Sequence, residues 1–257
     1  VLDQDQRHLY QPGLLFVPFG SYRPEDLARD RKSQLHDGIQ LMLDPLDVVE
    51  PAHNRVVFQS GESLTYDVLI MATGTRIAPE ATPGMLGDHW HKSVFDFYTL
   101  EGASALAVAF EKFDKGTVVI NVADMPIKCP VAPLEFAFLA DDYFTRRGIR
   151  DLVNLVYVTP LDGAFTKPTA SHFLGNLLEQ RGIKVVSNFV LQDVDGEKQT
   201  IRSYDDQSVA YDLLVTVPLH QGSALIEKSG MGDSMGFIPT NKHTLQTVAN
   251  PNVFALG

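Results

Sequence analysis

The sequence has 257 residues, of which 44% are hydrophobic and 21% are charged, a composition that excludes a disordered or fibrous chain. Its formal net charge of −11 at pH 7 argues against a nucleic-acid partner, because such binding usually needs a basic surface. No uninterrupted apolar run approaches the roughly 18 to 20 residues that a membrane-spanning helix needs.

The first part of the chain predicts a dinucleotide-binding fold without its opening elements. Val1–Asp3 is a predicted strand, and Pro24–Leu27 is predicted to begin a helix, with proline at an early position where its missing N–H costs little. A strand at Gly38–Leu43 and a polar hairpin at Arg55–Leu64 follow. The run Tyr66–Thr73 is nearly all apolar, which predicts a strand covered on both faces, as in a parallel sheet.

A second part of the chain repeats this layout in complete form. Its predicted elements are, in chain order, strand Thr117–Val122, helix Ala132–Arg147, strand Val153–Thr159, helix Lys167–Arg181, strand Gly182–Val186, hairpin Gln199–Val209 and strand Tyr211–Pro218. Each copy has a Gly-Ile pair that opens a strand, then a hairpin, then Tyr-Asp followed by an apolar run. This repetition indicates an internal duplication.

The duplication predicts an α/β protein made of two Rossmann-like dinucleotide-binding folds, each with a parallel sheet and a three-stranded antiparallel insert. The expected domains are residues 1–97 for the first fold, residues 98–225 for the second fold, and residues 226–257 for a return to the first. By comparison with the second copy, a strand, a glycine-rich phosphate loop and a helix, roughly 30 residues in all, are expected before Val1.

Candidate cofactor contacts lie at two strand ends of the first copy. Asp3 ends a strand where an acidic side chain can accept hydrogen bonds from the ribose of an adenine dinucleotide, although an aspartate there can also be a simple turn former. Ala72, Thr73 and Gly74 follow the last strand, where a glycine lets a cofactor approach the backbone closely.

The second copy differs from the first after its last strand, and its own phosphate loop is unusual. Residues 216–218 contain no glycine, and neither does the loop at 123–130, where Asp124 adds a negative charge. A pyrophosphate in that loop would meet Cβ atoms and a carboxylate instead of bare amides. We therefore expect that the second fold does not bind NAD in the usual manner.

The same loop carries Cys129, the only cysteine, which is expected just before a helix whose first positions are Pro130 or Val131. Unpaired N–H groups at a helix N-terminus and the adjoining Lys128 both favour a thiolate. The alternative is a small buried cysteine that only packs. Glu135, six residues further along, could move protons for the sulfur or could only complement the helix dipole.

A single cysteine excludes an internal disulfide and any cysteine-rich metal site. His89 and His91 could in principle hold a metal, but no third ligand lies at a recognisable spacing. We therefore expect two solvated loop histidines beside Trp90, and no metal.

Three motifs together resemble one known family. They are His-Leu-Tyr-Gln-Pro-Gly at 8–13, Met-Ala-Thr-Gly-Thr at 71–75, and Lys-Cys-Pro-Val-Ala-Pro-Leu-Glu at 128–135. The Ala-Thr-Gly motif is shared by many flavoproteins with two dinucleotide-binding folds, whereas the Cys-Pro-x-Ala-Pro stretch is more specific. Across nearly its whole length the chain resembles the sulfide:quinone oxidoreductases.

The resemblance implies an FAD held by the first fold. The cofactor-binding positions that it implies are Asp3, the backbone of Leu46, Ala72, Thr73, Gly74 and Gly257. It also implies that Cys129 belongs to a redox-active cysteine pair beside the flavin and that Glu135 is the acid on the following helix. Sulfide would attack the oxidised pair, and two electrons would pass through the flavin to a quinone.

Some family features are expected outside this chain. The partner cysteine and an amphipathic segment that seats these enzymes on a membrane would follow Gly257, and a further cysteine of some members is missing from 75–116. The resemblance therefore implies a cytoplasmic protein, peripheral on the inner face of the cell membrane, that is inactive as this fragment alone. It is also compatible with a homo-oligomer.

Two alternatives stay open. An NADH:quinone-type flavoprotein shares the architecture but needs a glycine-rich loop near Asp124. A non-catalytic fragment of the same fold would bind or sense, with Cys129 as a redox-responsive thiol.

Overall fold

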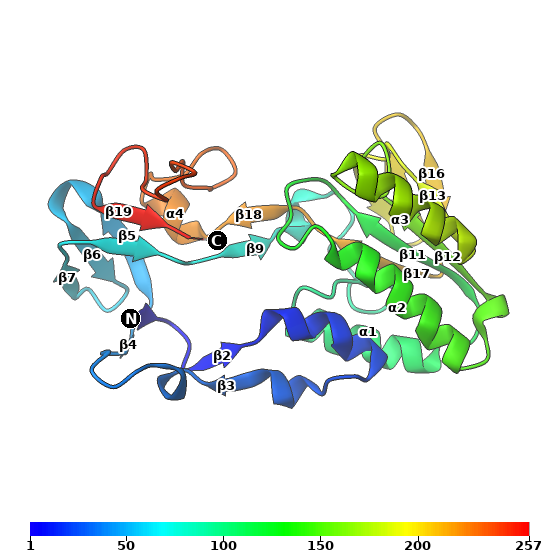
Figure 1. The fold of residues 1–257 in the computed structure, drawn as a ribbon, viewed down its shortest axis with the longest axis horizontal. Coiled ribbons are helices and arrows are strands. Elements are labelled where there is room, and N and C mark those ends of the chain that lie inside the picture. The colour runs from blue at the N-terminus through cyan, green and yellow to red at the C-terminus, as the bar shows by residue number, and fades with distance from the viewer. Residues whose placement is uncertain (257) are drawn as a thin grey trace. The chain divides into compact units, whose positions relative to one another are not determined.

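The structure is a computed structural model that describes residues 1–256 (Figure 1). The chain forms two compact units, each built from segments that are distant in sequence. Unit 1 consists of Val1–Leu9, Ala28–Arg76 and the chain from Gln221 onward, and unit 2 consists of Tyr10–Leu27 and Ile77–His220. These units differ from the predicted ranges 1–97, 98–225 and 226–257, because residues 10–27 and 77–97 pack within unit 2.

Unit 2 is built on a parallel sheet of five strands. In spatial order they are β10 (Val94–Phe95), β17 (Leu213–Val217), β11 (Gly116–Val122), β12 (Val153–Val158) and β13 (Ile183–Val186). Every neighbouring pair runs parallel. Ile120 of β11, Leu155 of β12 and Val215 of β17, the three central strands, are completely buried. The apolar runs of the second copy are thus covered on both faces, as expected.

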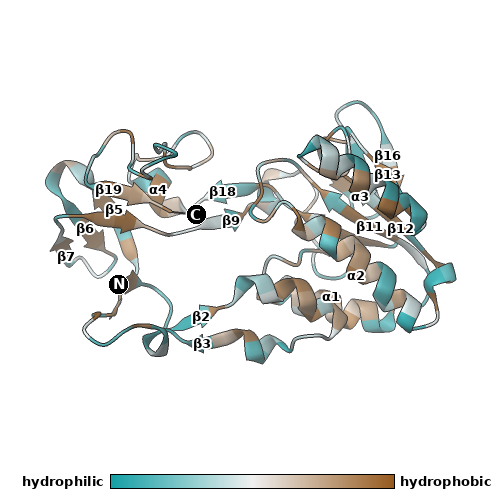
Figure 2. Ribbon diagram, in the orientation of Figure 1, coloured by the Kyte–Doolittle hydropathy of each residue, from teal (hydrophilic) through white to brown (hydrophobic). Residues whose placement is uncertain are grey.

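Three helices accompany this sheet, α1 (Leu100–Lys112), α2 (Ala132–Arg146) and α3 (Pro168–Gln180). Thr99 caps α1, because its side-chain Oγ1 accepts a hydrogen bond from Gly102 N at 3.0 Å. Hydrophobic and hydrophilic residues alternate along α1 and α2 in Figure 2. Their apolar faces, with Leu106 and Phe136 fully buried, join the main hydrophobic core of the unit.

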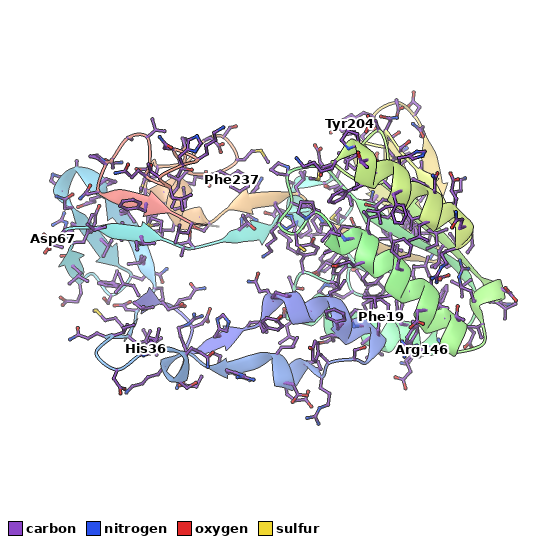
Figure 3. The ribbon with its side chains drawn as sticks, in the orientation of Figure 1. Phe19, His36, Asp67, Arg146, Tyr204 and Phe237 are labelled. Atoms are coloured by element: carbon purple, nitrogen blue, oxygen red, sulfur yellow. The ribbon has the colours of Figure 1, made fainter. Side chains whose placement is uncertain are left out.

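The segment at 11–19 forms a long 3₁₀ helix, η1 (Gln11–Phe19), which packs on α1 and α2. Phe19, marked in Figure 3, has its ring centroid 5.8 Å from that of Phe110 and 4.9 Å from that of Phe136. The helix predicted to begin at Pro24 is wrong. Pro24–Leu27 is one 3₁₀ turn, η2, because the next residues enter strand β3 (Ala28–Asp30) and pair with β2 (Arg7–Leu9).

Each copy carries the expected three-stranded antiparallel insert. In unit 1 the strands are β5 (Leu46–Glu50), β6 (Arg55–Phe58) and β7 (Ser63–Thr65). In unit 2 they are β14 (Leu191–Asp195), β15 (Thr200–Ser203) and β16 (Ser208–Ala210).

The other strands of unit 1 form short pairs. Parallel pairs join β1 (Leu2–Asp3) to β4 (Met42–Leu43) and β8 (Leu69–Met71) to β19 (Val253–Ala255), and the short helix α4 covers Ala224–Lys228. Strands β9 (Thr75–Ile77) and β18 (His220–Gly222) form a further two-stranded sheet. The strand expected at 38–43 is therefore limited to its last two residues.

The prediction that Tyr66–Thr73 is covered on both faces is wrong. Val68 and Ile70 are 58% and 60% exposed. Leu69 and Met71, which point to the opposite face of the strand, join a hydrophobic core of unit 1, whereas the face that carries Val68 and Ile70 meets solvent.

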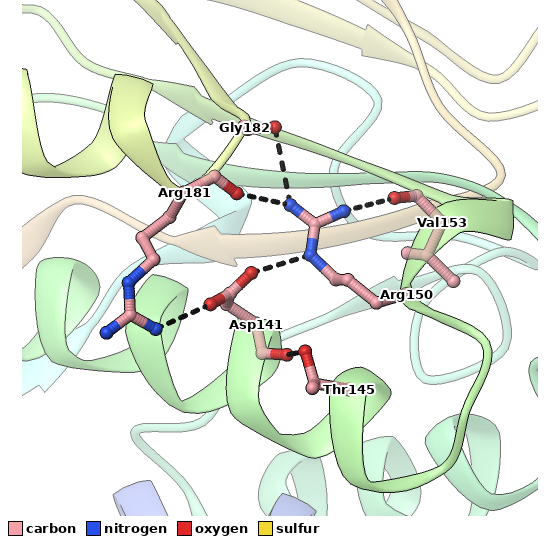
Figure 4. Close-up of polar contacts among 6 residues, drawn as sticks. All are labelled: Asp141, Thr145, Arg150, Val153, Arg181 and Gly182. Atoms are coloured by element: carbon pink, nitrogen blue, oxygen red, sulfur yellow. Dashed lines mark hydrogen bonds and ion pairs between the residues drawn. The ribbon is translucent and has the colours of Figure 1, made fainter.

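A buried carboxylate joins three elements of unit 2 (Figure 4). Asp141 of α2, whose side chain is 7% exposed, accepts hydrogen bonds from Arg150 Nε at 2.6 Å and from Arg181 Nη1 at 3.1 Å. Arg150 also donates to the carbonyl of Val153, the first residue of β12, and to the carbonyl of Arg181 after α3. The ion pairs of Asp141 and the hydrogen bonds of Arg150 together hold α2, the start of β12 and the end of α3 in place.

Candidate functional site

The strand order of unit 2 creates a topological switch point between β11 and β17. The chain leaves β11 toward β12 on one side, whereas β17 and β10 lie on the other side. Ligands of open α/β sheets bind outside the carboxyl ends of the strands at such a point. Three chain segments reach this edge: residues 96–99 after β10, residues 123–131 after β11, and residues 218–220 after β17.

Cys129 lies in the segment that follows β11, and its side chain is exposed. Its backbone has φ +55°, a left-handed conformation that few residues other than glycine adopt. α2 begins at Ala132, as predicted for the helix at 132–147, and Val131 is its N-cap, so the expectation that Pro130 or Val131 is a first helical position is wrong. The left-handed turn at Cys129 prevents an earlier start, and its carbonyl accepts from Ala132 N at 3.0 Å.

Tyr98 holds the backbone beside this cysteine. Its hydroxyl donates to the carbonyl of Lys128 at 3.0 Å and lies 3.4 Å from the carbonyl of Cys129. Burial raises the pKa of Tyr98, and the charge of Cys129 adds to the effect, so the phenol stays a protonated donor. Asp96, completely buried, accepts from Tyr98 N at 2.8 Å and thereby positions the tyrosine.

Lys128 provides a cationic group in the same loop. Its Nζ donates to Oε1 of Gln11 at 3.0 Å, which ties the loop to η1. Burial lowers the pKa of Lys128, because the ammonium form loses hydration. The lysine therefore releases its proton more easily than a surface lysine does.

Glu135 and Asp124 have different surroundings. Glu135 is exposed in the first turn of α2, and its charge is one of the causes that raise the pKa of Tyr98. Asp124 instead bonds within its own loop, where Oδ1 accepts from Met125 N at 2.7 Å. The charges of Cys129 and Glu135 thus both act on Tyr98.

His220 also lies at this edge of the sheet, although the sequence analysis did not identify it as a candidate. It lies three residues beyond β17 and is 1% exposed. Its ring meets the ring of Tyr98 edge to face, with centroids 5.0 Å apart. The sequence held one signal for His220, the predicted end of a strand at Pro218, because ligands bind at the carboxyl ends of the central strands.

The cofactor positions implied by the resemblance lie in unit 1, apart from Gly257, which lies outside the described residues. Asp3 ends β1, and its carboxylate accepts from Asp5 N at 2.9 Å and pairs with Arg31 Nε at 3.0 Å. A carboxylate offers about four lone-pair sites, so acceptor capacity remains for ribose hydroxyls. Asp3 therefore fits an adenine dinucleotide such as FAD.

The second strand end of unit 1 also fits a dinucleotide. Ala72, Thr73 and Gly74 are exposed directly after β8, and Gly74 has φ +66°, which favours glycine. No atom lies within 4 Å of where a Cβ of Gly74 would stand, so the backbone is open to a ligand. Leu46 is half-buried at the start of β5, opposite Phe58 of β6.

The histidines near Trp90 have structural partners. The Nε2 of His91 lies 3.2 Å from the carboxylate of buried Asp96, and its ring stacks on Trp90. His89 lies against Gly196, where a Cβ would come within 2.3 Å of the imidazole. Within residues 1–256, no three histidine, cysteine, aspartate or glutamate side chains gather closely enough to hold a metal.

Residues 3–257 match the sequence profile of the pyridine nucleotide-disulphide oxidoreductases. The chain belongs to this family. The mitochondrial sulfide:quinone oxidoreductases of Schizosaccharomyces pombe and Dictyostelium discoideum are 28% and 27% identical to the whole chain, which spans 58% of each relative. The X-ray structure of the sulfide:quinone oxidoreductase from Aquifex aeolicus superposes on the whole chain and 61% of its own length, with a TM-score of 0.85 at 18% identity.

A relative whose name gives a different activity is also similar. The chloroplastic/mitochondrial alternative NAD(P)H-ubiquinone oxidoreductase C1 of Arabidopsis thaliana is 26% identical over the whole chain and 54% of its own length.

The structural likeness to the Aquifex aeolicus protein confirms the two Rossmann-like folds. Every helix in the described part of the chain is too short or too polar to span a bilayer.

Proposed function

We propose that the whole protein is an FAD-dependent oxidoreductase that takes electrons from sulfide through Cys129 and passes them to a quinone. The observation that carries this proposal is the exposed thiol of Cys129 at the switch point of unit 2. Residues 123–130 offer no glycine-rich phosphate loop there, and a nucleophilic sulfur stands in its place. The similarity to sulfide:quinone oxidoreductases supports the same assignment.

The residues around the thiol suit sulfur chemistry. Lys128 brings a cation to the residue next to Cys129, which favours the thiolate, the reactive form of cysteine. Tyr98 fixes the carbonyls of both residues and so restrains the loop. Glu135 is exposed and can exchange protons with solvent during the reaction. Bound FAD would supply the two-electron acceptor, held in unit 1 by Asp3 and the backbone at Thr73–Gly74.

The similarity to an alternative NAD(P)H-ubiquinone oxidoreductase supports a second candidate, electron supply by NADH. That function requires a dinucleotide against the loop after β11. The loop carries Asp124 and Cβ atoms where a pyrophosphate needs bare amides, so we favour sulfide.

Anaerobic flavin bleaching distinguishes these functions. The whole protein should show oxidised flavin absorption that sulfide bleaches and that NADH leaves unchanged. In Cys129→Ser the rate of bleaching by sulfide should fall roughly a hundredfold or more, because the hydroxyl is a far weaker nucleophile. Bleaching of the variant by dithionite is the control that its flavin is in place.

Three outcomes would contradict this assignment. Wild-type bleaching rates in Cys129→Ser would remove the thiol from the reaction. Bleaching by NADH but not by sulfide would favour the second candidate, and a colourless whole protein would favour a binding or sensing role for the fold.

The quinone acceptor implies that the whole protein works at a membrane surface, on the inner face of the cell membrane or its mitochondrial counterpart, since long-chain quinones reside in the bilayer. We propose peripheral attachment through a segment other than residues 1–256, with a homo-oligomer as a compatible arrangement. Cosedimentation of the whole protein with lipid vesicles, compared with this chain alone, tests the attachment.

A further inference from the structure

Cys129 has a backbone conformation that its own sequence disfavours. Its φ of +55° lies in the left-handed region, where the Cβ of an L-residue comes too close to the neighbouring backbone. The next residue is Pro130, and a proline ring pushes the residue before it toward an extended backbone with negative φ. Cys129 is exposed, so core packing does not hold this turn. Such a conformation persists only where the surroundings determine it.

Hydrogen bonds hold the peptide groups on both sides of Cys129. On the C-terminal side, the carbonyl of Cys129 accepts from Ala132 N at 3.0 Å, a contact between backbone atoms. On the N-terminal side, the carbonyl of Lys128 accepts from the hydroxyl of Tyr98 at 3.0 Å. Because φ and ψ describe the rotation of these two planar groups about Cα, holding both of them defines the turn. The N-terminal group therefore depends on a side chain from the segment after β10.

Tyr98 can hold this carbonyl in one orientation because the tyrosine is itself fixed. Its backbone N–H donates to Oδ1 of Asp96 at 2.8 Å, and Asp96 is completely buried. Its ring meets the ring of His220 edge to face, with centroids 5.0 Å apart and an interplanar angle of 81°. Burial raises the pKa of Tyr98, so the hydroxyl remains a protonated donor at neutral pH.

The contact between Lys128 and Gln11 cannot replace this hydrogen bond. Nζ of Lys128 donates to Oε1 of Gln11 at 3.0 Å. The flexible four-carbon stem of a lysine separates Nζ from the backbone, so the peptide group can still rotate. Without the hydroxyl of Tyr98, the preference of a residue before proline should decide φ of Cys129.

We propose that Tyr98 is a positioning residue, which keeps Cys129 in the left-handed turn and thereby aims its thiol for reaction. The effect on turnover rests on the proposed function, whereas the effect on the turn does not. Rotation of the backbone from the left-handed to the extended conformation redirects the Cα–Cβ bond and with it the sulfur. One hydrogen bond shifts an equilibrium between two conformations by roughly tenfold at most, which is enough to make the aimed orientation the minor one.

Crystal structures of the reduced whole protein and of its Tyr98→Phe variant test the turn directly. This variant keeps the ring that faces His220 and removes only the hydroxyl. The φ of Cys129 should be positive in the wild type and negative in Tyr98→Phe, as is typical before proline. A variant structure in which Cys129 is still left-handed at full occupancy would overturn the proposal.

Steady-state kinetics with sulfide separate positioning from a purely structural role. In Tyr98→Phe, kcat should fall roughly tenfold and KM should stay within about twofold, because the hydroxyl acts on the orientation of the thiol. Tyr157→Phe is the matched control, since Tyr157 is 2% exposed and its hydroxyl bonds to the side chain of Thr159. It should keep kcat within about twofold. Equal losses of kcat in the two variants would assign the effect to packing and reject the proposal.

Alkylation of the reduced protein by iodoacetamide separates orientation from chemical reactivity. A small reagent can approach an exposed sulfur from many directions, so the rate constant at Cys129 should depend little on the turn. Measured by mass spectrometry between about pH 6 and 9, this rate constant should stay within about threefold of wild type in Tyr98→Phe. A tenfold lower rate constant or a shifted pH profile would show that the hydroxyl acts on the reactivity of the sulfur, which contradicts a positioning role.

These experiments and the flavin experiment fail independently. A lost turn in Tyr98→Phe, together with unaltered bleaching in Cys129→Ser, would keep the role of Tyr98 in the turn and reject the proposed function. Wild-type kcat in Tyr98→Phe, together with bleaching that requires Cys129, would keep the proposed function and reject the positioning role of Tyr98.

Discussion

The two copies of the duplicated layout bury corresponding strands to very different extents. Ile70 of β8 and Val215 of β17 occupy the same place in their copies, because each stands four residues after the tyrosine of its Tyr-Asp pair. Val215 is completely buried, whereas Ile70 is 60% exposed. Val215 shares the main hydrophobic core with Leu106 of α1 and Phe136 of α2, whereas the face of β8 that carries Ile70 meets solvent. Burial of an apolar strand thus depends on what covers its faces and not only on its own hydrophobicity.

The same strand ends differ in chemistry. The first copy ends in an exposed Thr73–Gly74 turn whose open backbone suits close approach of a cofactor. The second ends in Pro218 and the buried imidazole of His220, beside a loop that carries a thiol. One copy thus offers backbone and a carboxylate, Asp3, to a ligand, and the other offers reactive side chains. Under the proposed function, the first copy would hold the cofactor and the second copy would react with the substrate.

The largest effect is expected at Asp141, the buried carboxylate that joins three elements of unit 2. Asp141→Ala leaves Arg150, whose side chain is 20% exposed, without its ion partner and should lower the free energy of unfolding by about 3 to 5 kcal/mol. Asp142→Ala on the same helix is the matched control, because its pair with Arg146 is exposed, and it should cost under about 1 kcal/mol. Urea denaturation followed by the fluorescence of Trp90, the only tryptophan, reports on unit 2. Equal midpoints for the two variants would contradict this expectation.

A smaller effect on stability, which depends on pH, is expected for the second copy because it contains His220. The pKa of His220 falls from 6.5 to about 4 in the folded protein, so the unfolded chain binds a proton first as the pH drops. Above about pH 6.5 both states are neutral and the histidine has no effect on stability. Between about pH 6.5 and 4 the free energy of unfolding of unit 2 should decrease, by on the order of 3 kcal/mol in total.

Urea titrations of Trp90 fluorescence at several pH values measure this slope. His220→Gln, which cannot take up the proton, should flatten the slope over this window by the same amount. A variant with the wild-type slope would assign the pH dependence to other groups.

Truncating Val215 and Ile70, the two corresponding strand residues, tests directly whether the copies differ in burial. Val215→Ala should lower the free energy of unfolding by about 1 to 3 kcal/mol, because it opens a cavity in a packed core. Ile70→Ala removes more atoms, yet it should cost less than about 1 kcal/mol in this chain, because the side chain is already mostly in water. Urea denaturation followed by far-ultraviolet circular dichroism compares them. A larger loss for Ile70→Ala would show that β8 is covered in solution.

The sequence by itself determined the features that depend on local patterns. The duplication, the α/β class and the three-stranded inserts follow from periodicity and turn residues. The helix predicted at 132–147 matches α2, which begins at Ala132. Alternation of apolar and polar residues is a short-range property, so it can be read without knowing what lies beside each element.

Only the tertiary structure decided which residues meet. Tyr98, Cys129 and His220 are separated along the chain and come together because β10, β17 and β11 are adjacent in an order that differs from their sequence order. The exposure of Ile70, the left-handed turn at Cys129 and the short η2 turn likewise depend on neighbouring strands and loops. Long-range strand pairing fixes which side chains share an edge of the sheet, and no local pattern encodes that pairing.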